Sequence, residues 1–431
     1  MSKHSSTQNA SRTNGSTVTE TSATNVPAVD PRLLVRERGF AGYLAEFKGK
    51  LRSGDLGSVP VVLGLILIAA IFQGLTGNFL NAGNLSNIAL YIAGPGLISV
   101  GIVFVLLLGE IDLSLGSVAG VSAAISAVLS IQHGVNEYLA IVIAIVAALA
   151  IGALHGFFFA KIGVPAFVVT LAGMLTWSGL QGYVMGNTGT LNNIPNGVIA
   201  NLDNYFFDSV AAAYGLAAVS VAGYLAAALL GARSRREAGL PFRPVSEIGL
   251  RAGLLAVLAF GAAYVLNQDR GLPLALVVLL GVVIVTDFVL RRTTYGRKVF
   301  AVGGGVEAAR RAGINVARLR ISVYMISAGL ASVGGLFMAS QAGFADKQTG
   351  SGFVLMNAIA AAVIGGTSLF GGRGKTWSAL LGALVIQSII TGLDLEGISQ
   401  SIQYMITGAV LLGAVVLDSV SRRTQKSAGR G

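Results

Sequence analysis

The chain has 431 residues, of which 54% are apolar and 11% are charged, and its formal net charge at pH 7 is +11. Apolar runs of about twenty residues, the length that an α-helix needs to cross a bilayer, recur almost to the C-terminus. The chain has no cysteine, which excludes disulfides and thiolate metal sites. Its three histidines give no support to a catalytic or structural metal site. The composition predicts an all-α polytopic membrane protein.

The N-terminal part of the chain differs from the rest. Residues 1–30 are rich in Ser, Thr and Asn and have no apolar periodicity, which predicts a disordered cytoplasmic tail. Residues 31–57 repeat aromatic and aliphatic side chains at helical spacing among several Lys and Arg. This pattern predicts a basic amphipathic helix on the membrane surface, and the alternative is an ordinary helix packed against other loops. No apolar run precedes Val59, so we expect no secretory signal peptide.

The transmembrane domain is expected over residues 58–420, followed by a cytoplasmic tail at 421–431, with roughly ten to twelve spanning helices. Segments 115–131 and 353–370 are short and rich in Gly, Ala and Ser, so each is a candidate for a broken or re-entrant helix. The candidate spans in chain order are 59–78, 86–108, 115–131, 138–160, 165–185, 209–231, 248–267, 273–291, 318–340, 353–370, 375–393 and 401–418.

The distribution of basic residues predicts the orientation of these spans. If the chain starts inside and alternates, 28 of its 30 Lys and Arg fall on the cytoplasmic side, and Arg270 and Lys347 fall outside. Both termini are therefore expected in the cytoplasm, as is the basic segment 291–320. The same rule explains the net positive charge through contact with a lipid membrane, so we expect no nucleic-acid partner.

Within the basic segment, residues 306–312 are predicted to form a two-turn helix. The three glycines 303–305 would leave the chain free before it, and Gly313 can end it in a left-handed conformation. Glu307 suits the positive end of the helix dipole, and Glu307 with Arg311 form an i,i+4 pair. A short, well-specified helix between two spans predicts a contact with something outside the membrane.

Few ionisable residues lie within or beside the apolar runs, and each is a functional candidate because charge is costly in a bilayer. Glu110 and Asp112 lie in the polar break GEIDLS. They either gate or line a solute path, together with Ser114 and Asn357, or they cap the helix that follows. The sequence leaves both interpretations open.

Two further ionisable residues have structural interpretations. His155, which precedes Gly156, is expected to be a hydrogen-bonded packing residue rather than a proton relay, and Asp287 is expected to pair with Arg291 one turn later. The spans otherwise offer mostly Ser, Thr, Asn, Gln and Tyr. This scarcity of buried charge favours a neutral polar solute and an energy source outside the membrane.

A nucleotide site in this chain is not expected. Gly374, Lys375 and Thr376 resemble the end of a P-loop, but the position six residues before the lysine is Leu369 instead of glycine. We therefore expect no cofactor in this chain. The absence of a nucleophile–base pair or a metal set also argues against an enzyme.

Two glycine-bordered loops, 109–116 and 366–371, resemble each other and suggest an internal repeat. An inverted repeat would place the two loops on opposite sides of the membrane. Simple alternation of the predicted spans places both inside. The sequence does not decide between these arrangements.

Residues 305–315, GVEAARRAGIN, resemble the EAA-like cytoplasmic loop of ATP-binding-cassette importer permeases, in the form seen in ribose- and xylose-type sugar permeases. The resemblance continues through YGRKVFAVGG before this loop and through SAGLASVGGLFMAS after it, and covers most of residues 60–420. GEIDLSLG and GGTSLFGG lean toward the sugar branch. An insertion at roughly 233–290 looks like that of xylose-type and multiple-sugar permeases.

The resemblance implies a homodimer of subunits with ten or more helices and a solute path along the dimer axis. It implies two partners, a cytoplasmic ATPase, often with two fused ATPase domains, that would bind ATP and Mg²⁺, and an extracytoplasmic solute-binding protein. The location implied is a bacterial inner membrane. Within the coupling loop 292–317, the residues implied to contact the ATPase are Glu307, Ala308, Ala309, Arg310, Arg311 and Gly313. Residues 317–321 read ARLRI and lack the later Ile-x-Leu-Pro of the classical pattern.

These observations predict the permease of an ATP-driven importer for a neutral monosaccharide, such as a xylose-like pentose. A nucleoside or branched-chain amino-acid permease of the same superfamily is the first alternative. A second alternative, from a different class, is an ion-coupled secondary carrier that uses Glu110 or Asp112 as its coupling carboxylate.

Overall fold

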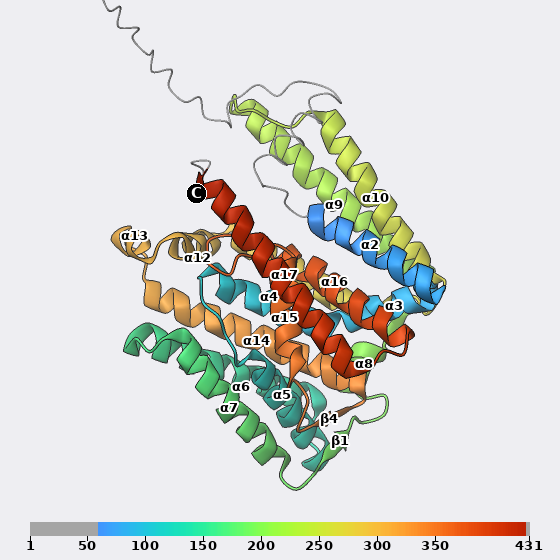
Figure 1. Ribbon diagram of the computed structural model, residues 1–431, viewed down its shortest axis with the longest axis vertical. Coiled ribbons are helices and arrows are strands. Elements are labelled where there is room, and N and C mark those ends of the chain that lie inside the picture. The colour runs from blue at the N-terminus through green and yellow to red at the C-terminus, as the bar shows by residue number, and fades with distance from the viewer. Residues whose placement is uncertain (1–58, 428–431) are drawn as a thin grey trace, which may run out of the picture.

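The computed structural model describes residues 59–427. The predicted tail 1–30 and the predicted interfacial helix 31–57 lie outside the described residues, as do the last four residues of the chain. Figure 1 shows a helical bundle with β1 and β4 at its edge, and the chain has two two-stranded sheets among its described residues. The helices that build it, in chain order, are α2 (Val59–Thr76), α3 (Ala82–Tyr91), α4 (Ala93–Leu107), α5 (Leu115–Ala127), α6 (Glu137–Phe157), α7 (Ala166–Met185), α8 (Val198–Asn204), α9 (Val210–Glu237), α10 (Val245–Asn267), α11 (Leu274–Arg292), α12 (Thr294–Gly304), α13 (Val306–Arg311), α14 (Val316–Ala342), α15 (Phe353–Ile364), α16 (Thr376–Leu395) and α17 (Gln400–Ser427).

Two helices end in π-helical turns, η1 (Val128–Gln132) after α5 and η2 (Phe158–Ile162) after α6. Among the described residues, eight helices are long and apolar enough to cross a membrane, or nine if the bent pair α3–α4 is one span. The bend between α3 and α4 is 41°. This confirms an all-α polytopic membrane protein. The bend falls within the span predicted at 86–108, which was not expected to be broken, whereas the segment 115–131, a candidate for a broken helix, forms one candidate span at Leu115–Gln132.

α15 differs most from the predicted spans. The sequence predicts a segment at 353–370, but α15 has 12 residues, which is about 18 Å of helix against a hydrocarbon core of about 30 Å. Gly365 and Gly366 then lead the chain into a loop at 365–375. α15 is therefore a half-length helix, too short to cross the hydrocarbon core, as one of the two short segments was expected to be.

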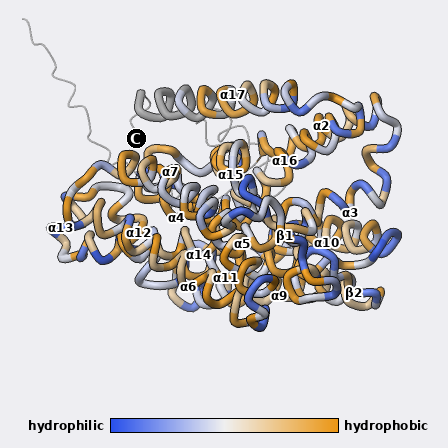
Figure 2. Tube along the Cα trace, turned by 90° about the horizontal axis from the view of Figure 1, so that it is seen from below, coloured by the Kyte–Doolittle hydropathy of each residue, from blue (hydrophilic) through white to orange (hydrophobic). Residues whose placement is uncertain are grey.

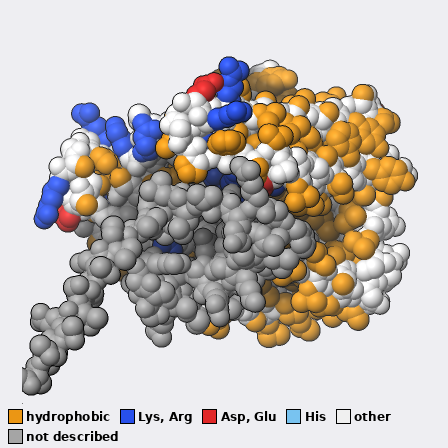
Figure 3. All heavy atoms as spheres, turned by 90° about the horizontal axis from the view of Figure 1, so that it is seen from above, with side chains coloured by type: hydrophobic (Ala, Val, Ile, Leu, Met, Phe, Trp, Pro, Cys, Tyr) orange, Lys and Arg blue, Asp and Glu red, His pale blue; other side chains and the backbone are white. Residues whose placement is uncertain are grey.

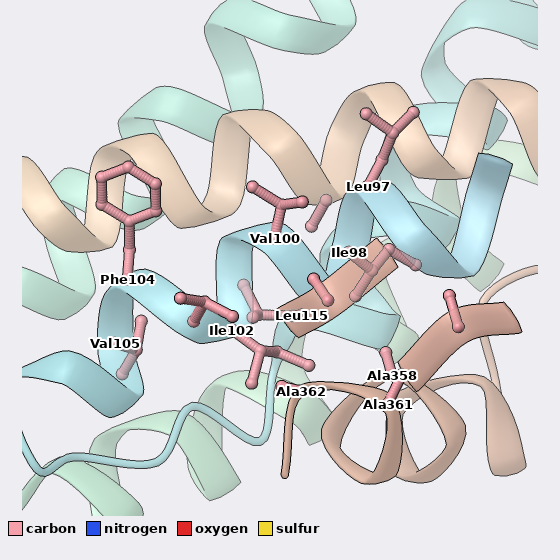
Figure 4. Packing of buried hydrophobic residues seen from close by; sticks show 14 of the residues in the cluster. Leu97, Ile98, Val100, Ile102, Phe104, Val105, Leu115, Ala358, Ala361 and Ala362 are labelled. Carbon is pink, nitrogen blue, oxygen red and sulfur yellow. The ribbon is translucent and has the colours of Figure 1, made fainter. Parts of the chain in front are cut away.

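The core lies around α4 and α14. α4 is apolar on every side and almost every residue in it is buried, as expected for a helix enclosed by other helices. α14 packs against α4, α5 and α6. Gly101 allows close approach of α4 to α14, because a Cβ there would overlap the backbone of Ser327. Figure 4 shows side chains of α4 such as Ile98 and Ile102 near the small residues Ala358 and Ala362 of α15.

α9 and α10 form a hairpin that stands apart from this core (Figure 1). They pack mainly against each other, and α10 reaches the bundle through α3. Ala213 and Ala217 are the only buried residues of α9. Large apolar side chains such as Leu254 and Val257 are exposed, so this hairpin presents its surface to the membrane. The insertion predicted at roughly 233–290 has different bounds from this hairpin, because it includes α10 and α11 but only the last turn of α9.

The two ends of the bundle differ in structure and charge. Short antiparallel sheets lie at one end, here named the strand end, where β1 (Thr190–Asn192) pairs with β4 (Phe344–Asp346) and β2 (Phe206–Phe207) with β3 (Leu272–Pro273). Figure 2 shows the hydrophilic residues gathered in turns such as those around β1 and β2. Arg270 and Lys347 flank these strands.

The opposite end, here named the basic end, carries α12, α13 and the turn between α9 and α10. Figure 3 shows Lys and Arg side chains gathered beside an apolar band. Loops 109–114 and 365–375 meet at this end, where the N–H of Gly372 donates to the carbonyl of Leu107 over 3.0 Å. The two similar loops therefore lie side by side in the fold, where Gly109 also lies against Phe370 and Gly371.

Candidate functional site

α13 is a short helix at the basic end, and the residue that follows its C-cap ends it in a left-handed conformation. The N–H of Ile314 donates to the carbonyl of Ala309 over 3.1 Å, and that of Gly313 donates to the carbonyl of Arg310 over 3.0 Å. These two bonds form a Schellman motif, which requires a left-handed residue after the helix. Gly313 provides it with a φ of +78°, so the predicted helix stop is confirmed.

The side chains of α13 divide into an outward and an inward set. Glu307, Ala308, Arg310 and Arg311 are exposed, whereas Ala309 is buried. Ala309 therefore anchors α13 to the bundle and is not available for contact with a partner. The predicted pair of Glu307 with Arg311 is wrong, because Glu307 pairs with Arg310, three residues later, at 2.9 Å.

The glycines before α13 also differ from the prediction of a free chain. Gly303 and Gly304 belong to α12, and Gly305 alone lies between the two helices. Gly303 lies against the backbone of Leu107 and Gly372. Sequence reasoning missed this because a close backbone approach from distant segments leaves no local pattern.

The loop 109–114 is held by a chain of buried hydrogen bonds. Ser114 donates from both its backbone N–H and its hydroxyl to Asp112, at 2.8 and 2.6 Å. Trp177 Nε1 donates to His155 Nε2 over 2.9 Å, so in the neutral ring His155 Nδ1 carries the proton. That nitrogen lies 3.3 Å from Ser114 Oγ. The chain of donors therefore runs from Trp177 through His155 and Ser114 to the carboxylate of Asp112.

This chain gives Asp112 a structural role in the loop. The residue is 4% exposed, and its carboxylate accepts both hydrogen bonds from Ser114, the residue just before α5. A place in a solute path stays a prediction for Asp112 and Ser114. His155 is a hydrogen-bonded packing residue, as predicted, because its two ring nitrogens are engaged by α7 and by the loop. Asp287 pairs with Arg291 at 2.8 Å, which confirms that prediction as well.

Glu110 has a different environment from Asp112. Its carboxylate lies 3.5 Å from Arg320 of α14, and the guanidinium of Arg320 stacks 4.2 Å from the ring centre of Phe159. Burial raises the pKa of Glu110, and the charge of Arg320 opposes that shift. Glu110 therefore ties the loop to the basic end of α14 rather than standing free in a solute path.

A pocket of 270 Å³ opens at the strand end of the bundle between α15, α16 and α17. Asn357 projects into it from α15, which places this predicted residue in a pocket. The rings of Phe353 and Tyr404 are stacked at its rim, with centres 3.4 Å apart. The lining, which contains no charged side chain, consists of Ser351, Phe353, Val354, Asn357, Ile390, Gln400, Gln403, Tyr404 and Thr407.

The chemistry of this pocket suits a neutral polyol. Amide and hydroxyl groups can donate and accept hydrogen bonds, and an aromatic face can cover the apolar side of a sugar ring. Glu110, Asp112 and Ser114 are not among the residues that line this pocket, so the structure does not bring all four predicted residues into one site. Sequence reasoning missed Gln403, Tyr404 and Thr407, although polar residues at positions 400, 403, 404 and 407 form a stripe at helical spacing.

A wider cup of 530 Å³ lies at the foot of the α9–α10 hairpin. The guanidinium of Arg270 is already engaged there, by Asp269 at 2.9 Å, by Asn87, and by the ring of Phe206 at 4.5 Å. The positive charge of Arg270 is thus paired within the fold. Across residues 59–427, no group of three or more His, Asp or Glu is placed to hold a metal ion.

The eight or nine long apolar helices of the described residues define a multi-pass membrane protein, and its pocket is lined by polar and apolar side chains without a charge. The family model for the permease component of branched-chain amino acid transport systems matches residues 84–415. The chain belongs to this family of transport permeases, whose members are transporter subunits and not enzymes.

Curated relatives cover most of the chain. It is 33% identical over 386 residues to the xylose transport system permease protein of Escherichia coli (strain K12), a match that covers 89% of this chain and 95% of that protein. The protein of the same description from Haemophilus influenzae is 32% identical over 381 residues, or 87% and 99% of the two chains. The ribose import permease protein of Bacillus subtilis (strain 168) is 29% identical over 357 residues, or 83% and 91%. No solved structure matches the chain.

Proposed function

We propose that this chain is the membrane-spanning permease of an ATP-driven importer for a neutral monosaccharide, such as xylose or a related pentose. The observation that carries the choice of solute is the pocket around Asn357, which offers amides, hydroxyls and stacked rings without a charge. The names of the xylose and ribose relatives support the same solute class.

The energy source is proposed to be a separate cytoplasmic ATPase, a single chain with two fused ATPase domains or a pair of chains. The exposed side chains of α13, Glu307, Ala308, Arg310 and Arg311, are its proposed contact, with Gly313 setting the end of the helix. ATP and Mg²⁺ would bind to that partner, so this chain is proposed to hold no cofactor. The basic end faces the cytoplasm of a bacterial inner membrane in this proposal, with both termini inside, because Lys and Arg concentrate there.

Two further partners belong to the proposal. An extracytoplasmic solute-binding protein would deliver the sugar at the strand end, where the pocket opens. A second copy of this chain would complete a homodimer whose solute path runs along the dimer axis. ATP-driven closure of the ATPase would move α13, and the spans would alternate access between the two sides.

The alternatives fit the structure less well. The family description names branched-chain amino acids, but such solutes carry an ammonium and a carboxylate, and no charged side chain lines the pocket to pair with them. A nucleoside is uncharged and stays as the second candidate. An ion-coupled carrier would need a carboxylate available for proton or sodium binding, whereas Asp112 is bonded to Ser114 and Glu110 faces Arg320.

Uptake by the reconstituted complex tests this proposal. The permease, its ATPase and its binding protein would be placed in proteoliposomes, and uptake of labelled xylose, ribose, a nucleoside and leucine would be measured with ATP. We expect ATP-dependent uptake of a pentose that Asn357→Ala reduces. Uptake driven by an ion gradient in vesicles without the ATPase would overturn the proposal.

A further inference from the structure

Three segments that are far apart in the sequence meet through bare backbone at the basic end. They are the end of α4 at Leu107, the last turn of α12 at Gly303, and the loop 365–375 at Gly371 and Gly372. The N–H of Gly372 donates to the carbonyl of Leu107 over 3.0 Å. A Cβ on Gly303 would overlap that carbonyl oxygen and come within 2.8 Å of the N–H nitrogen of Gly372.

The backbones of the three segments are in close contact. Side chains that meet at an interface can change rotamer when one element shifts, whereas backbone against backbone cannot. A Cβ on Gly371 would in turn lie 2.9 Å from the carbonyl oxygen of Gly303. A displacement of α12 toward the loop 365–375 would therefore push that loop or break its bond to Leu107.

The loop is joined firmly to α15. The N–H groups of Gly366 and Thr367 donate to the carbonyls of Val363 and Ala362, at 2.9 and 3.0 Å. Ser368 closes the loop by donating from its N–H to the carbonyl of Arg373 over 2.9 Å. Movement of the loop therefore reaches the C-terminal end of α15 directly.

The other end of α15 forms the pocket. Phe353, Val354 and Asn357, from its first turns, line the pocket. Between its two ends, α15 contacts its neighbours through small residues. Ala358 and Ala361 face α4 (Figure 4), and Gly382 of α16 lies against the carbonyl of Ala361. No large side chains interlock at these contacts, so α15 and the adjoining part of α16 can shift as one rigid body.

We propose that the contact of Gly303 with Gly371 and Gly372, here named the glycine junction, transmits movement of the coupling helix to the solute pocket through α15. α13 follows α12 after Gly305 alone, so a force on α13 acts on α12 first. The inference rests on the proposed function and adds to it a route and the residues that make the route. Gly303 is a positioning residue in this route, since it contacts neither the solute nor the ATPase.

The absence of cysteine from the chain allows a direct test. Asn357→Cys would place the only thiol of the permease in the pocket. In the complex with its ATPase, reconstituted in nanodiscs, the rate of modification by a methanethiosulfonate reagent would be measured with and without ATP and vanadate. We expect the nucleotide to change that rate by about five-fold or more.

The second variant is Gly303→Ala in the same background, with Gly304→Ala as its matched control. A Cβ on Gly304 meets no atom within 4 Å, so both changes raise helix propensity equally and only the first disrupts the junction. We expect Gly303→Ala to abolish the nucleotide effect on labelling and Gly304→Ala to preserve it. Basal ATP hydrolysis by each complex would show that assembly is intact.

Each outcome has one meaning. If the nucleotide does not change the labelling of Asn357→Cys in the parent background, the proposed role of the pocket fails. If labelling responds in that background and equally with Gly303→Ala, the glycine junction is overturned while the proposed function stands. Should Gly303→Ala not assemble, Gly374→Ala replaces it. Its Cβ would lie 2.8 Å and 3.1 Å from the side chains of Thr367 and Leu107, so it should reduce the response, and an unchanged response would overturn the inference.

Discussion

Replacing Gly313 with alanine should weaken docking of the ATPase although the new methyl group would touch nothing. Gly313 has a φ of +78°, and a Cβ built on it meets no atom within 4 Å. The cost is therefore conformational. A left-handed alanine costs roughly 1–2 kcal/mol, and the lower entropy of the unfolded alanine chain offsets about 0.4–1 kcal/mol of it. The net loss is about 1 kcal/mol.

This loss should fall on α13 alone. The Schellman bonds from Gly313 and Ile314 close only the last turn of α13, and Asn315 caps α14 independently by accepting from the N–H of Arg318 at 3.0 Å. The bundle should keep its melting temperature, while α13 frays. If docking needs a formed α13, a loss of about 1 kcal/mol lowers the affinity for the ATPase about five-fold.

The assay is a binding isotherm between the purified ATPase and the permease in nanodiscs. Gly313→Asn separates strain from bulk, since asparagine is larger than alanine but adopts left-handed backbone more readily. Strain predicts affinities in the order Gly, then Asn, then Ala, with Gly304→Ala equal to the parent. If Gly313→Asn binds more weakly than Gly313→Ala, the methyl or amide obstructs docking and the reasoning from backbone strain is refuted.

Three further outcomes are expected. Tyr404→Ala should lower ATP-driven pentose uptake and leave basal ATP hydrolysis unchanged, because it removes one face of the ring stack over the pocket; equal uptake would argue against that pocket. Trp177→Phe should lower the melting temperature, since it leaves His155 Nε2 buried without its donor, at a cost of roughly 1–3 kcal/mol. Trp377→Phe is its control, as the only other tryptophan of the chain. Asp203→Asn should stabilise the protein at alkaline pH but not at acidic pH.

The sign of the Asp203 effect follows from its burial. Asp203 is 3% exposed, and burial raises the pKa of its carboxyl from 3.8 to about 7 against the opposing charge of Arg270. The folded state therefore binds a proton that the unfolded state has lost. The stability that this proton contributes is fully present below about pH 4 and is lost as the pH rises through about 7.

Thermal melts across this range measure that effect. The asparagine imitates the protonated acid, so the two proteins should melt alike near about pH 4 and diverge toward about pH 8, with the variant more stable. Asp208→Asn, at an exposed position of the next turn, is the control and should follow the parent. If the melting temperatures of Asp203→Asn and the parent change equally with pH, ionisation of Asp203 does not destabilise the folded protein, and this reasoning is wrong.

Much of the architecture could be predicted from the sequence because the bilayer imposes length and polarity on each helix. The helix stop at Gly313 and the pair of Asp287 with Arg291 follow from local rules. Such rules act over three or four residues, so the residues concerned are close together in the chain.

Other features depended on segments that the chain brings together from far apart. The predicted span 353–370 is longer than α15, because it ran through Gly365 and Gly366 to Leu369 and Phe370, which belong to the glycine-bordered loop that follows. The pocket around Asn357 required α17 beside α15, and only one of its polar residues was singled out beforehand. The partner of Glu307 was wrong by one position, since i,i+3 and i,i+4 pairs are equally permitted on a helix and rotamers choose between them.

By itself the sequence determined the class of protein, the side on which the basic residues gather and the existence of α13. Those properties depend on hydropathy, charge and single-residue conformations, which are local. The tertiary structure decided what α13 is connected to. In the sequence, nothing distinguishes Gly303 from other glycines. Its contact with Leu107 and Gly372 is visible only in the structure, because a backbone contact between distant segments leaves no pattern of side chains in the sequence.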